Sequence, residues 1–502
     1  MGMETGTIIT LALYFLLMLG IGVYAWRTST SDVSEYMLGG RKLGPGVTAL
    51  SAGASDMSGW LLLGLPGAMF VSGLSAAWIG LGLAFGALMN YLLVAPRLRV
   101  YTALADDAIT IPDYFEKRFQ DRSRLLRVFS AVIIVVFFTL YTASGMVSGG
   151  KLFDSAFGVD YAWGLWVTAG VVVLYTLLGG FLAVSLTDAV QGSIMFCALI
   201  LVPIVAITQV GGTGETASIL RDIDPNLLSM TAGMTIIGVL SSLAWGLGYF
   251  GQPHVIVRFM AIRSVRDVPA ARNIGKSWML VSLIGALATG LAGLAYATRT
   301  GLDVADPETI FIILSDVLFH PLITGFLLAA ILSAVMSTIS SQLLVSSSSL
   351  TEDFYAVFLH RGASQKELVR VGRGAVLAVS LIAIILAYDP ESTVLTLVSN
   401  AWAGLGAAFG PLIILSLMWR RVTRNGALAG MLTGAAVVLF WIYAPVLEDG
   451  QALTTVVYEL LPGFILSMLV IVLVSLMGRP PETVTATFDR AEDELKAARS
   501  SG

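Results

Sequence analysis

One acidic residue stands in the middle of a long uncharged stretch of this chain. Between Lys42 and Arg97 the only charged residue is Asp56. A carboxylate at the centre of a bilayer costs about 2.5 to 3.5 kcal/mol on insertion scales unless it faces protein, water or an ion. Small residues surround it in the sequence G-A-S-D-M-S-G, and they allow a membrane helix to break where its backbone lines a cavity. Residues 45–66 therefore predict a broken membrane helix that holds an ion and solute site.

The composition predicts a polytopic, all-α membrane protein embedded in a lipid bilayer. Of the 502 residues, 56% are hydrophobic and 12% are charged, whereas a soluble domain carries about 25% charged residues. The single cysteine, Cys197, excludes an intrachain disulfide. The sequence contains no Walker loop, zinc spacing, nucleic-acid signature or Ser/His/Asp set. We therefore expect no enzyme activity, no nucleic-acid partner and no obligate protein partner.

The apolar runs predict about thirteen transmembrane helices. With the N-terminus outside and the C-terminus in the cytoplasm, all but three of the 29 Lys and Arg residues fall on the cytoplasmic side. This asymmetry is the one that the positive-inside rule describes, so it supports both the count and the orientation. The predicted spans lie near residues 7–26, 45–71, 75–95, 125–150, 161–181, 185–209, 231–253, 275–297, 319–344, 372–388, 393–418, 425–444 and 455–477.

Spans two to six and seven to eleven predict two five-helix repeats of opposite orientation, because an odd number of helices inverts the second repeat. The second repeat begins with another interrupted segment, which contains Gly246, Gly248, Gly251 and Pro253. Two broken segments at matching positions indicate a transporter binding site. The expected segments are a peripheral helix and loop (1–44), the first repeat (45–209), the second repeat (231–418), two peripheral helices (425–477) and a cytoplasmic tail (478–502).

A face of small and hydroxyl residues in the ninth span suggests an ion site. The positions i, i+3, i+4 and i+7 of one helix face are Ala334, Ser337, Thr338 and Ser341. Together with free carbonyls at the break near Ala54 and Met57, the hydroxyls would form an all-oxygen site that suits Na⁺ before any transition metal. The alternative is a packing face whose hydroxyls bond back to their own helix.

Asp56 itself has several interpretations. Its carboxylate either coordinates Na⁺ directly, or orients the broken backbone by accepting N–H bonds, or serves as a structural partner of a nearby arginine or of helix-end amides. We favour the organising role, because carbonyl and hydroxyl oxygens already suffice as ligands.

Aromatic residues flank both predicted breaks. Trp60 follows the first break, and Trp245 and Tyr249 lie four residues apart in the second. Their faces suit a compact apolar ring and also attract a cationic amine. Tyr141 lies among small residues in the fourth span. The alternative for any single membrane aromatic is packing against lipid or a place in the interfacial aromatic belt.

Two further charged residues are candidates for gating. Asp188, near the inner end of the sixth span, is either a second ion or gating carboxylate or a helix N-terminal acid satisfied by local amides, which Ser185 and Thr187 favour. Arg41 precedes the first break and is either an inner-gate cation or a positive-inside anchor.

Eight stretches, in order along the chain, resemble the sodium/solute symporter family and, within it, the bacterial members that carry proline. They are L-G-G-R-K-L-G-P, T-A-L-S-A-G-A-S-D-M-S-G-W-L-L, I-P-D-Y-F, G-G-F-L-A-V-S, A-W-G-L-G-Y-F-G-Q-P-H, A-V-M-S-T-I-S-S-Q-L-L, T-E-D and T-R-N-G-A-L-A-G.

This resemblance implies a LeuT-type inverted repeat over spans two to eleven and Na⁺-coupled uptake of L-proline by alternating access, with one Na⁺ per proline, in the bacterial cytoplasmic membrane. The implied Na⁺ positions are Ala54, Met57, Ala334, Ser337 and Thr338. The implied proline positions are Trp60, Tyr141, Trp245, Tyr249 and Pro253, and the implied coupling positions are Asp56, Ser58 and Gly59. Alternatives are a symporter of another small amino acid or a carboxylate, and a membrane sensor module.

Overall fold

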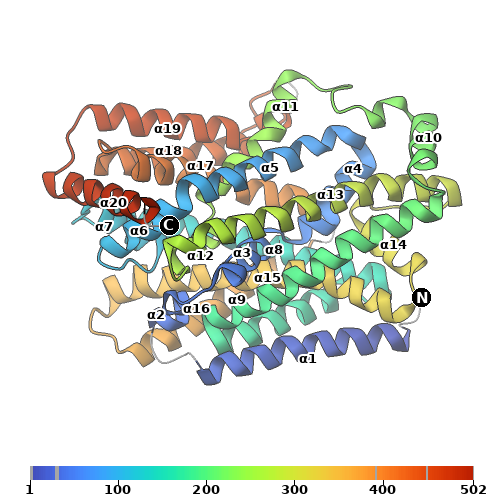
Figure 1. Cartoon of the computed structure of the whole chain (residues 1–502), viewed down its shortest axis with the longest axis horizontal. Coiled ribbons are helices and arrows are strands. Elements are labelled where there is room, and N and C mark those ends of the chain that lie inside the picture. Colours follow the sequence, from blue (N-terminus) through green and yellow to red (C-terminus); the bar gives the residue numbers. More distant parts are fainter. Residues whose placement is uncertain (1–3, 29–32, 390–392, 448–449, 501–502) are drawn as a thin grey trace.

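The computed structural model describes residues 4–28, 33–389, 393–447 and 450–500. All regular structure in these residues is helical, apart from one isolated bridge between Leu43 and Ile262. Most helices run along one common axis (Figure 1). Residues 1–3 and 29–32 of the expected first segment, and 501–502 of the expected tail, lie outside the described residues.

Every predicted span corresponds to helical residues. Nine helices among the described residues are long and apolar enough to cross a membrane, so the chain is a multi-pass membrane protein. Eight spans correspond to single helices, which are α1 (Thr5–Thr28), α8 (Leu125–Phe157), α13 (Val268–Thr300), α15 (Pro321–Ser348), α16 (Gln365–Leu386), α17 (Val394–Met418), α18 (Arg424–Tyr443) and α19 (Leu460–Leu476).

Spans five and six form one continuous element, α9 (Tyr161–Val210), with a kink at Gly180. Gly180 has φ 56°, a left-handed conformation that a side chain rarely adopts. A Cβ atom there would lie 2.6 Å from the Tyr36 carbonyl oxygen. A glycine is therefore required where the two halves of α9 meet.

Both predicted breaks are present. The second span consists of α3 (Pro45–Asp56), η2 (Trp60–Gly64) and α4 (Leu65–Ser72). The seventh consists of α11 (Ile236–Leu243), η6 (Ala244–Gly251) and α12 (Pro253–Ala261). Pro253 has no backbone N–H and a fixed φ, so it begins α12 without leaving an unpaired donor.

The third span is also irregular. It runs through α5 (Ala77–Met89), the wide turn η4 (Asn90–Val94) and α6 (Ala95–Leu104). Pro96 lies at the start of α6, where its missing N–H interrupts the regular helix ladder. Wide turns of this kind often occur at functional sites.

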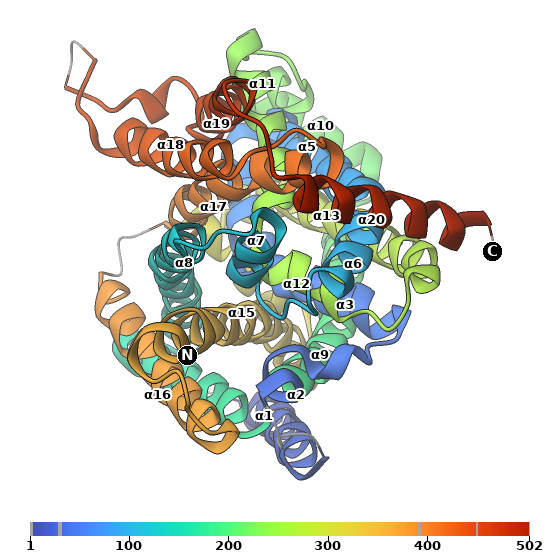
Figure 2. The ribbon, with the colours of Figure 1, turned by 90° about the vertical axis from the view of Figure 1, so that its left-hand side faces the viewer.

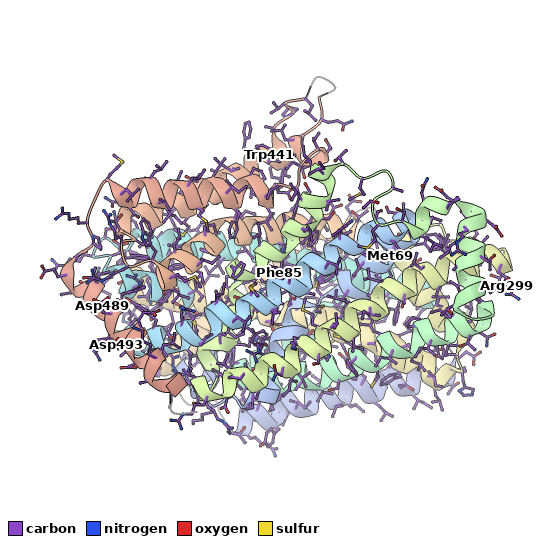
Figure 3. The ribbon with its side chains drawn as sticks, turned by 45° about the horizontal axis from the view of Figure 1, so that its top comes forward. Met69, Phe85, Arg299, Trp441, Asp489 and Asp493 are labelled. Carbon is purple, nitrogen blue, oxygen red and sulfur yellow. The ribbon has the colours of Figure 1, made fainter. Side chains whose placement is uncertain are left out.

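Helix α15 lies in the centre of the bundle, between α3, α8 and α9 (Figure 2). Its residues from 327 to 344 are all buried. Helix α1 lies at one rim, and α18 and α19 lie at the opposite rim (Figure 1). The outer surface carries apolar side chains, such as Phe85 with 65% of its surface exposed (Figure 3). Such a surface suits lipid rather than water.

Short helices close the two ends of the bundle. The helices α2 (Val33–Leu38), α7 (Ile111–Phe119) and α20 (Glu482–Ser500) lie at one end, and α20 crosses that end (Figures 1 and 2). The helices α10 (Thr213–Ile223) and α14 (Ile310–Leu318) lie at the other end, near the N-terminus. Asp489 and Asp493 of α20 are accordingly far from Arg299 (Figure 3).

Candidate ion and solute site

The break after α3 lies directly against the hydroxyl face of α15. The Ser337 Oγ atom donates a hydrogen bond to the Ala54 carbonyl oxygen at 2.7 Å. The Thr338 Oγ1 atom donates to the Ala334 carbonyl oxygen at 3.1 Å. These four residues and Met57 are buried. The structure thus brings together the break and the α15 face that were expected to hold Na⁺.

The available donor atoms fit a sodium ion. Hydroxyl and carbonyl oxygens are hard ligands without charge, which suits a hard monovalent cation. No group of three or more His, Cys, Asp or Glu side chains that could hold a metal ion occurs among the residues that the structure describes. Ser337 also donates to the Ala334 carbonyl oxygen, at 3.2 Å. Its bond back to the helix and its contact with the break therefore coexist.

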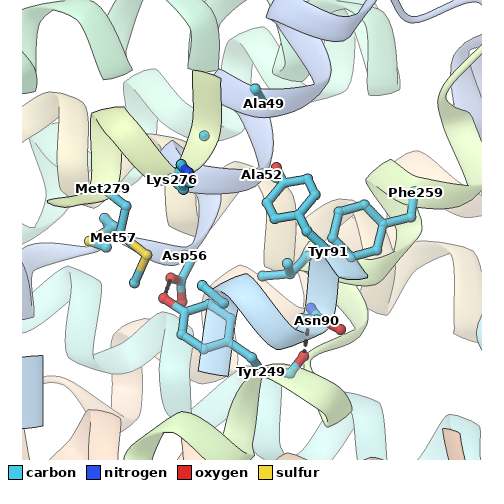
Figure 4. Close-up of a pocket in the computed structure, with 14 residues that line it drawn as sticks. Ala49, Ala52, Asp56, Met57, Asn90, Tyr91, Tyr249, Phe259, Lys276 and Met279 are labelled. Carbon is cyan, nitrogen blue, oxygen red and sulfur yellow. Dashed lines mark hydrogen bonds between the residues drawn. The ribbon is translucent and has the colours of Figure 1, made fainter. Parts of the chain in front are cut away.

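Asp56 is the point at which both breaks and α8 meet. Its Oδ2 atom accepts a hydrogen bond from the Tyr249 hydroxyl (Figure 4). Its backbone oxygen accepts bonds from Trp60 Nε1 at 3.1 Å and from the Tyr141 hydroxyl at 3.4 Å. Three of the predicted aromatic residues thus converge on one residue of the break.

The expectation that the Asp56 carboxylate accepts backbone N–H bonds is wrong for this structure. The amide of Met57 donates to the Gly53 oxygen, and the amide of Ser58 donates to the Asp56 oxygen, each at 2.9 Å. Because these amides are already satisfied by carbonyls, the carboxylate bonds Tyr249 instead. It still organises the site, by joining the first break to the second.

Gly59 lets the break approach α8 closely. A Cβ atom on Gly59 would lie 2.2 Å from Ser148 Oγ, so no side chain fits there. The Ser58 Oγ atom is buried and has no hydrogen-bond partner in the structure. Both residues lie within the break.

Trp245 faces a different side of the second break. Its ring stacks on Tyr458, with centroids 5.2 Å apart and an angle of 20° between the ring planes. Its backbone oxygen accepts a bond from Trp402 Nε1 at 2.8 Å. The Tyr458 hydroxyl donates to the Ser399 oxygen at 2.9 Å. Sequence reasoning missed Tyr458 and Trp402, because neither lies next to a break in the sequence.

A cavity lies on one side of Asp56 (Figure 4). Its volume is about 30 Å³, and Asp56, Met57 and Tyr249 line it. The other predicted aromatic residues do not line it. Asn90, from the turn η4, does, and its Nδ2 atom donates to the Tyr249 carbonyl oxygen at 3.1 Å. Sequence reasoning missed Asn90, although it is the only amide side chain between Trp60 and Tyr101.

Asp188 belongs to a buried network and not to a helix start, so the expectation of local amide partners is wrong. Its Oδ2 atom accepts bonds from Ser51 Oγ at 2.7 Å and Arg258 Nη2 at 3.1 Å. Asp188 lies inside α9, where helical bonds occupy the amides. The same arginine donates to Ser341 Oγ at 2.6 Å. This network joins α3, α9, α12 and α15.

Sequence reasoning also missed Arg258. It was counted among the cytoplasmic basic residues, yet its side chain is fully buried. Only the fold shows that it lies beside Asp188, because the two residues are far apart in the chain.

Arg41 joins three segments at the end of the bundle that carries α20. It donates to the backbone oxygens of Met260 at 2.8 Å and Ala108 at 2.7 Å, and it pairs with Asp107 at 2.9 Å. Burial lowers the pKa of the Arg41 guanidinium, and Asp107 opposes that shift. The contacts with α12 and the turn after α6 go beyond those of a simple membrane-surface anchor.

A bundle of apolar helices in which two glycine-broken members meet at a buried polar site is the arrangement of a membrane transporter. The model of the sodium:solute symporter family matches residues 36–434. The chain belongs to this family.

Characterised relatives cover nearly the whole chain. The osmoregulated proline transporter OpuE of Bacillus subtilis is 60% identical over 95% of this chain and 96% of its own length. The high-affinity proline transporter PutP of the same organism is 57% identical over 95% of this chain and 100% of its own length. A sodium/proline symporter of Staphylococcus aureus is 53% identical over 96% of this chain and 94% of its own length.

Solved transporter structures share the fold. A Na⁺-coupled sialic acid symporter in a substrate-bound, outward-open state superposes with a TM-score of 0.80 at 19% identity, over 95% of this chain and 99% of that chain. The nucleobase-cation-symport-1 family transporter Mhp1, in a closed conformation, superposes with a TM-score of 0.56 at 12% identity, over 92% and 99%. At these identities the likeness concerns the fold alone.

Proposed function

We propose that this chain is a Na⁺-coupled symporter that takes up L-proline by alternating access, with one Na⁺ per proline. The observation that carries the proposal is the contact between the Ala54 carbonyl at the α3 break and the Ser337 hydroxyl of α15. The names of relatives at 53% to 60% identity support proline as the solute.

In this proposal, Na⁺ binds between the α3 break and α15, and its binding preorganises the solute site. The proposed ligands are the backbone oxygens of Ala54, Met57 and Ala334 and the hydroxyls of Ser337 and Thr338. Because α3 and α15 then move as one unit, the carboxylate of proline meets half-helix N–H groups already in place.

The proline ring is proposed to pack among the aromatic residues near the two breaks. The aromatic residues are Trp60, Tyr141, Trp245 and Tyr249. Pro253 completes the proposed set. Asp56 transmits the effect of the ion, since it joins Tyr249 of the second break to the first break. Ser58 and Gly59 are the other proposed coupling positions, and Gly59 permits the close approach of the break to α8. Arg41 and the Asp188 network support the gating movement at the inner half.

The free energy released when one Na⁺ enters the cell is sufficient to accumulate a scavenged solute. A charge that crosses 100 mV releases about 2.3 kcal/mol, and a tenfold concentration gradient adds about 1.4 kcal/mol. The sum, about 3.7 kcal/mol, supports an accumulation of roughly 500-fold. A coupling ratio of one is therefore adequate for a nutrient or an osmolyte.

The proposed topology has thirteen crossings, an outside N-terminus and a cytoplasmic C-terminus in the bacterial cytoplasmic membrane. The two LeuT-type repeats are 45–209 and 231–418. The first peripheral helix and its loop (1–44), the last two helices (425–477) and the tail (478–502) lie outside the repeats. The distribution of lysine and arginine supports this arrangement.

Competition for uptake tests the solute assignment. Purified protein in liposomes should take up labelled proline only with Na⁺, and unlabelled proline should compete better than other small amino acids or carboxylates. Stronger competition by another solute would replace proline with the alternative substrate. Binding without uptake of any solute would instead favour a sensor module.

A further inference from the structure

A cavity of about 500 Å³ lies at the end of the bundle that carries α20. Its wall is formed by the turn η4, the starts of α6 and α13, and Ala498 of α20. Helix α20 crosses α6 there and also contacts η7 (Val265–Asp267), the turn before α13 (Figure 2). Two basic side chains, Arg266 and Arg272, line this cavity, and its other walls are largely apolar, with Leu92, Pro96 and Val268 among them.

The positive charge in this cavity is not balanced by acids in its wall. No aspartate or glutamate among the residues that the structure describes lines it. The acid next to Arg266 in the chain, Asp267, pairs with Arg263 at 2.6 Å. Arg272 donates to the Asn273 side-chain oxygen at 3.2 Å, but this amide is neutral and leaves the charge of the guanidinium uncompensated. An anion in the cavity would therefore be attracted by both arginines.

Another basic cavity at the same end of the bundle provides a contrast. Arg420, Arg421 and Arg479 line it, but two acids, Glu482 and Asp489, line it as well. Arg420 also pairs with Asp489 at 2.8 Å. The protein's own carboxylates thus offset the positive charge of that cavity. The cavity beside α13 is the better site for an external anion.

The exposed side chains of α13 change from basic to apolar with distance from this cavity. Arg272, Lys276, Leu280 and Ile284 follow one another at intervals of four residues, so neighbouring members lie on one face of the helix. Lys276 is exposed, and Leu280 and Ile284 expose 53% and 57% of their surface. Ile284 lies about 18 Å along the helix from Arg272, comparable to the roughly 15 Å hydrocarbon depth of one leaflet. This order matches a charged headgroup with an acyl chain attached, and not a free anion.

We propose that this cavity binds the headgroup of an anionic phospholipid, with Arg266 and Arg272 as its basic partners and an acyl chain along Leu280 and Ile284. Basic pockets between membrane helices on the cytoplasmic side are suited to such headgroups. The bound lipid joins α6, α13 and α20 at the end of the bundle that is proposed to face the cytoplasm. The inference does not depend on the solute or on the coupling ion proposed above.

Native mass spectrometry of the purified chain in detergent tests this site. The probes are phosphatidylglycerol and phosphatidylcholine with identical acyl chains, so the two lipids differ only in the headgroup. We expect the unmodified chain to bind phosphatidylglycerol more tightly. Arg272→Gln, which removes one positive charge, should weaken phosphatidylglycerol binding by about fivefold and leave phosphatidylcholine binding unchanged.

Arg421→Gln is the matched control, because it removes the same charge from the other cavity at this end. It should keep phosphatidylglycerol binding within about twofold of the unmodified chain. Equal binding of the two lipids by the unmodified chain, a comparison that needs no variant, would overturn the site, and so would an equal loss for both variants. Displacement of phosphatidylglycerol by inorganic phosphate at constant ionic strength would show that a free anion, and not a lipid, occupies the cavity.

Discussion

Two neighbouring hydroxyls on α15, Ser337 and Thr338, belong to the proposed ion site and differ in their hydrogen bonds. Ser337 already contacts the Ala54 carbonyl of the break, whereas Thr338 bonds the Ala334 carbonyl of its own helix. A sodium ion between them would draw on oxygens from both helices. The proposed ion site therefore depends on single oxygen atoms rather than on the overall shape of the cavity.

Replacing Thr338 with Ala should raise the half-saturating Na⁺ concentration for proline uptake by about tenfold, because one of a few neutral ligands is lost. Ser340→Ala is the matched control. Its hydroxyl is equally buried and bonds the Ser337 carbonyl at 3.1 Å, outside the proposed ligand set. Similar Na⁺ dependence for both variants, measured as uptake into liposomes, would refute the ion assignment.

At this scale, sequence reasoning found the residues whose type is unusual for their surroundings. Asp56 was found because a lone charge in an apolar run needs an explanation. The pairing of Asp188 with Arg258 was not found, because residues 70 positions apart become neighbours only through the fold. Tyr458 and Trp402, which contact Trp245, were missed for the same reason.

At the scale of elements, helix breaks were predictable and their partners were not. Glycines and Pro253 mark both breaks in the sequence, because they interrupt the regular helix ladder. The wide turn η4 has a weaker signal, the lone amide of Asn90 before Pro96.

One arginine joins three elements at the end that carries α20. Arg127 of α8 bonds Asp353 of η9 (Ser349–Leu359) at 2.8 Å and pairs with Glu116 of α7 at 3.2 Å. Asp353 is fully buried, and burial raises its pKa to about 7 while Arg127 opposes the shift. Arg127 thus compensates the negative charge of a carboxylate that is buried in the fold.

Replacing Arg127 with Ala should lower the free energy of unfolding by about 3–5 kcal/mol at pH 8, because a buried carboxylate loses its partner. The loss should be smaller at pH 5. Without Arg127, the folded-state pKa of Asp353 rises further above its value in the unfolded chain. A group with a raised folded-state pKa stabilises the folded protein at low pH, and this stabilisation is lost as the pH rises through that pKa.

Thermal unfolding in detergent at both pH values measures this effect. Arg420→Ala is the control, because its ion pair with Asp489 is exposed, at 55% and 50%, and should matter little. A shift of the Arg127→Ala Tm that is independent of pH would contradict the electrostatic explanation.

At the scale of the whole molecule, the apolar runs and the distribution of basic residues predict a membrane bundle and its orientation. Hydropathy and charge distribution are each summed over many residues. An error of a few residues in the predicted end of one helix therefore has little effect on either. The packing of α15 in the centre is different, since it depends on side-chain fit between helices that are distant in sequence.

Cysteine labelling should reveal the proposed orientation. The chain has a single cysteine, Cys197, so a Cys197→Ser background permits new cysteines one at a time. Asp222→Cys in α10 should react with a membrane-impermeant thiol reagent added outside intact cells. Asp493→Cys in α20, whose side chain is 79% exposed, should react only after permeabilisation. The reverse pattern would contradict the N-out, C-in arrangement.

Simultaneous flux of ²²Na⁺ and labelled proline into liposomes that contain only this protein tests the central claim most directly. We expect an inward Na⁺ gradient to drive proline accumulation and a negative interior potential to increase it. The initial fluxes of Na⁺ and proline should stand in a ratio of about one, because one coupling site is proposed. Proline entry that is independent of Na⁺, or Na⁺ entry that is unaffected by proline, would contradict it.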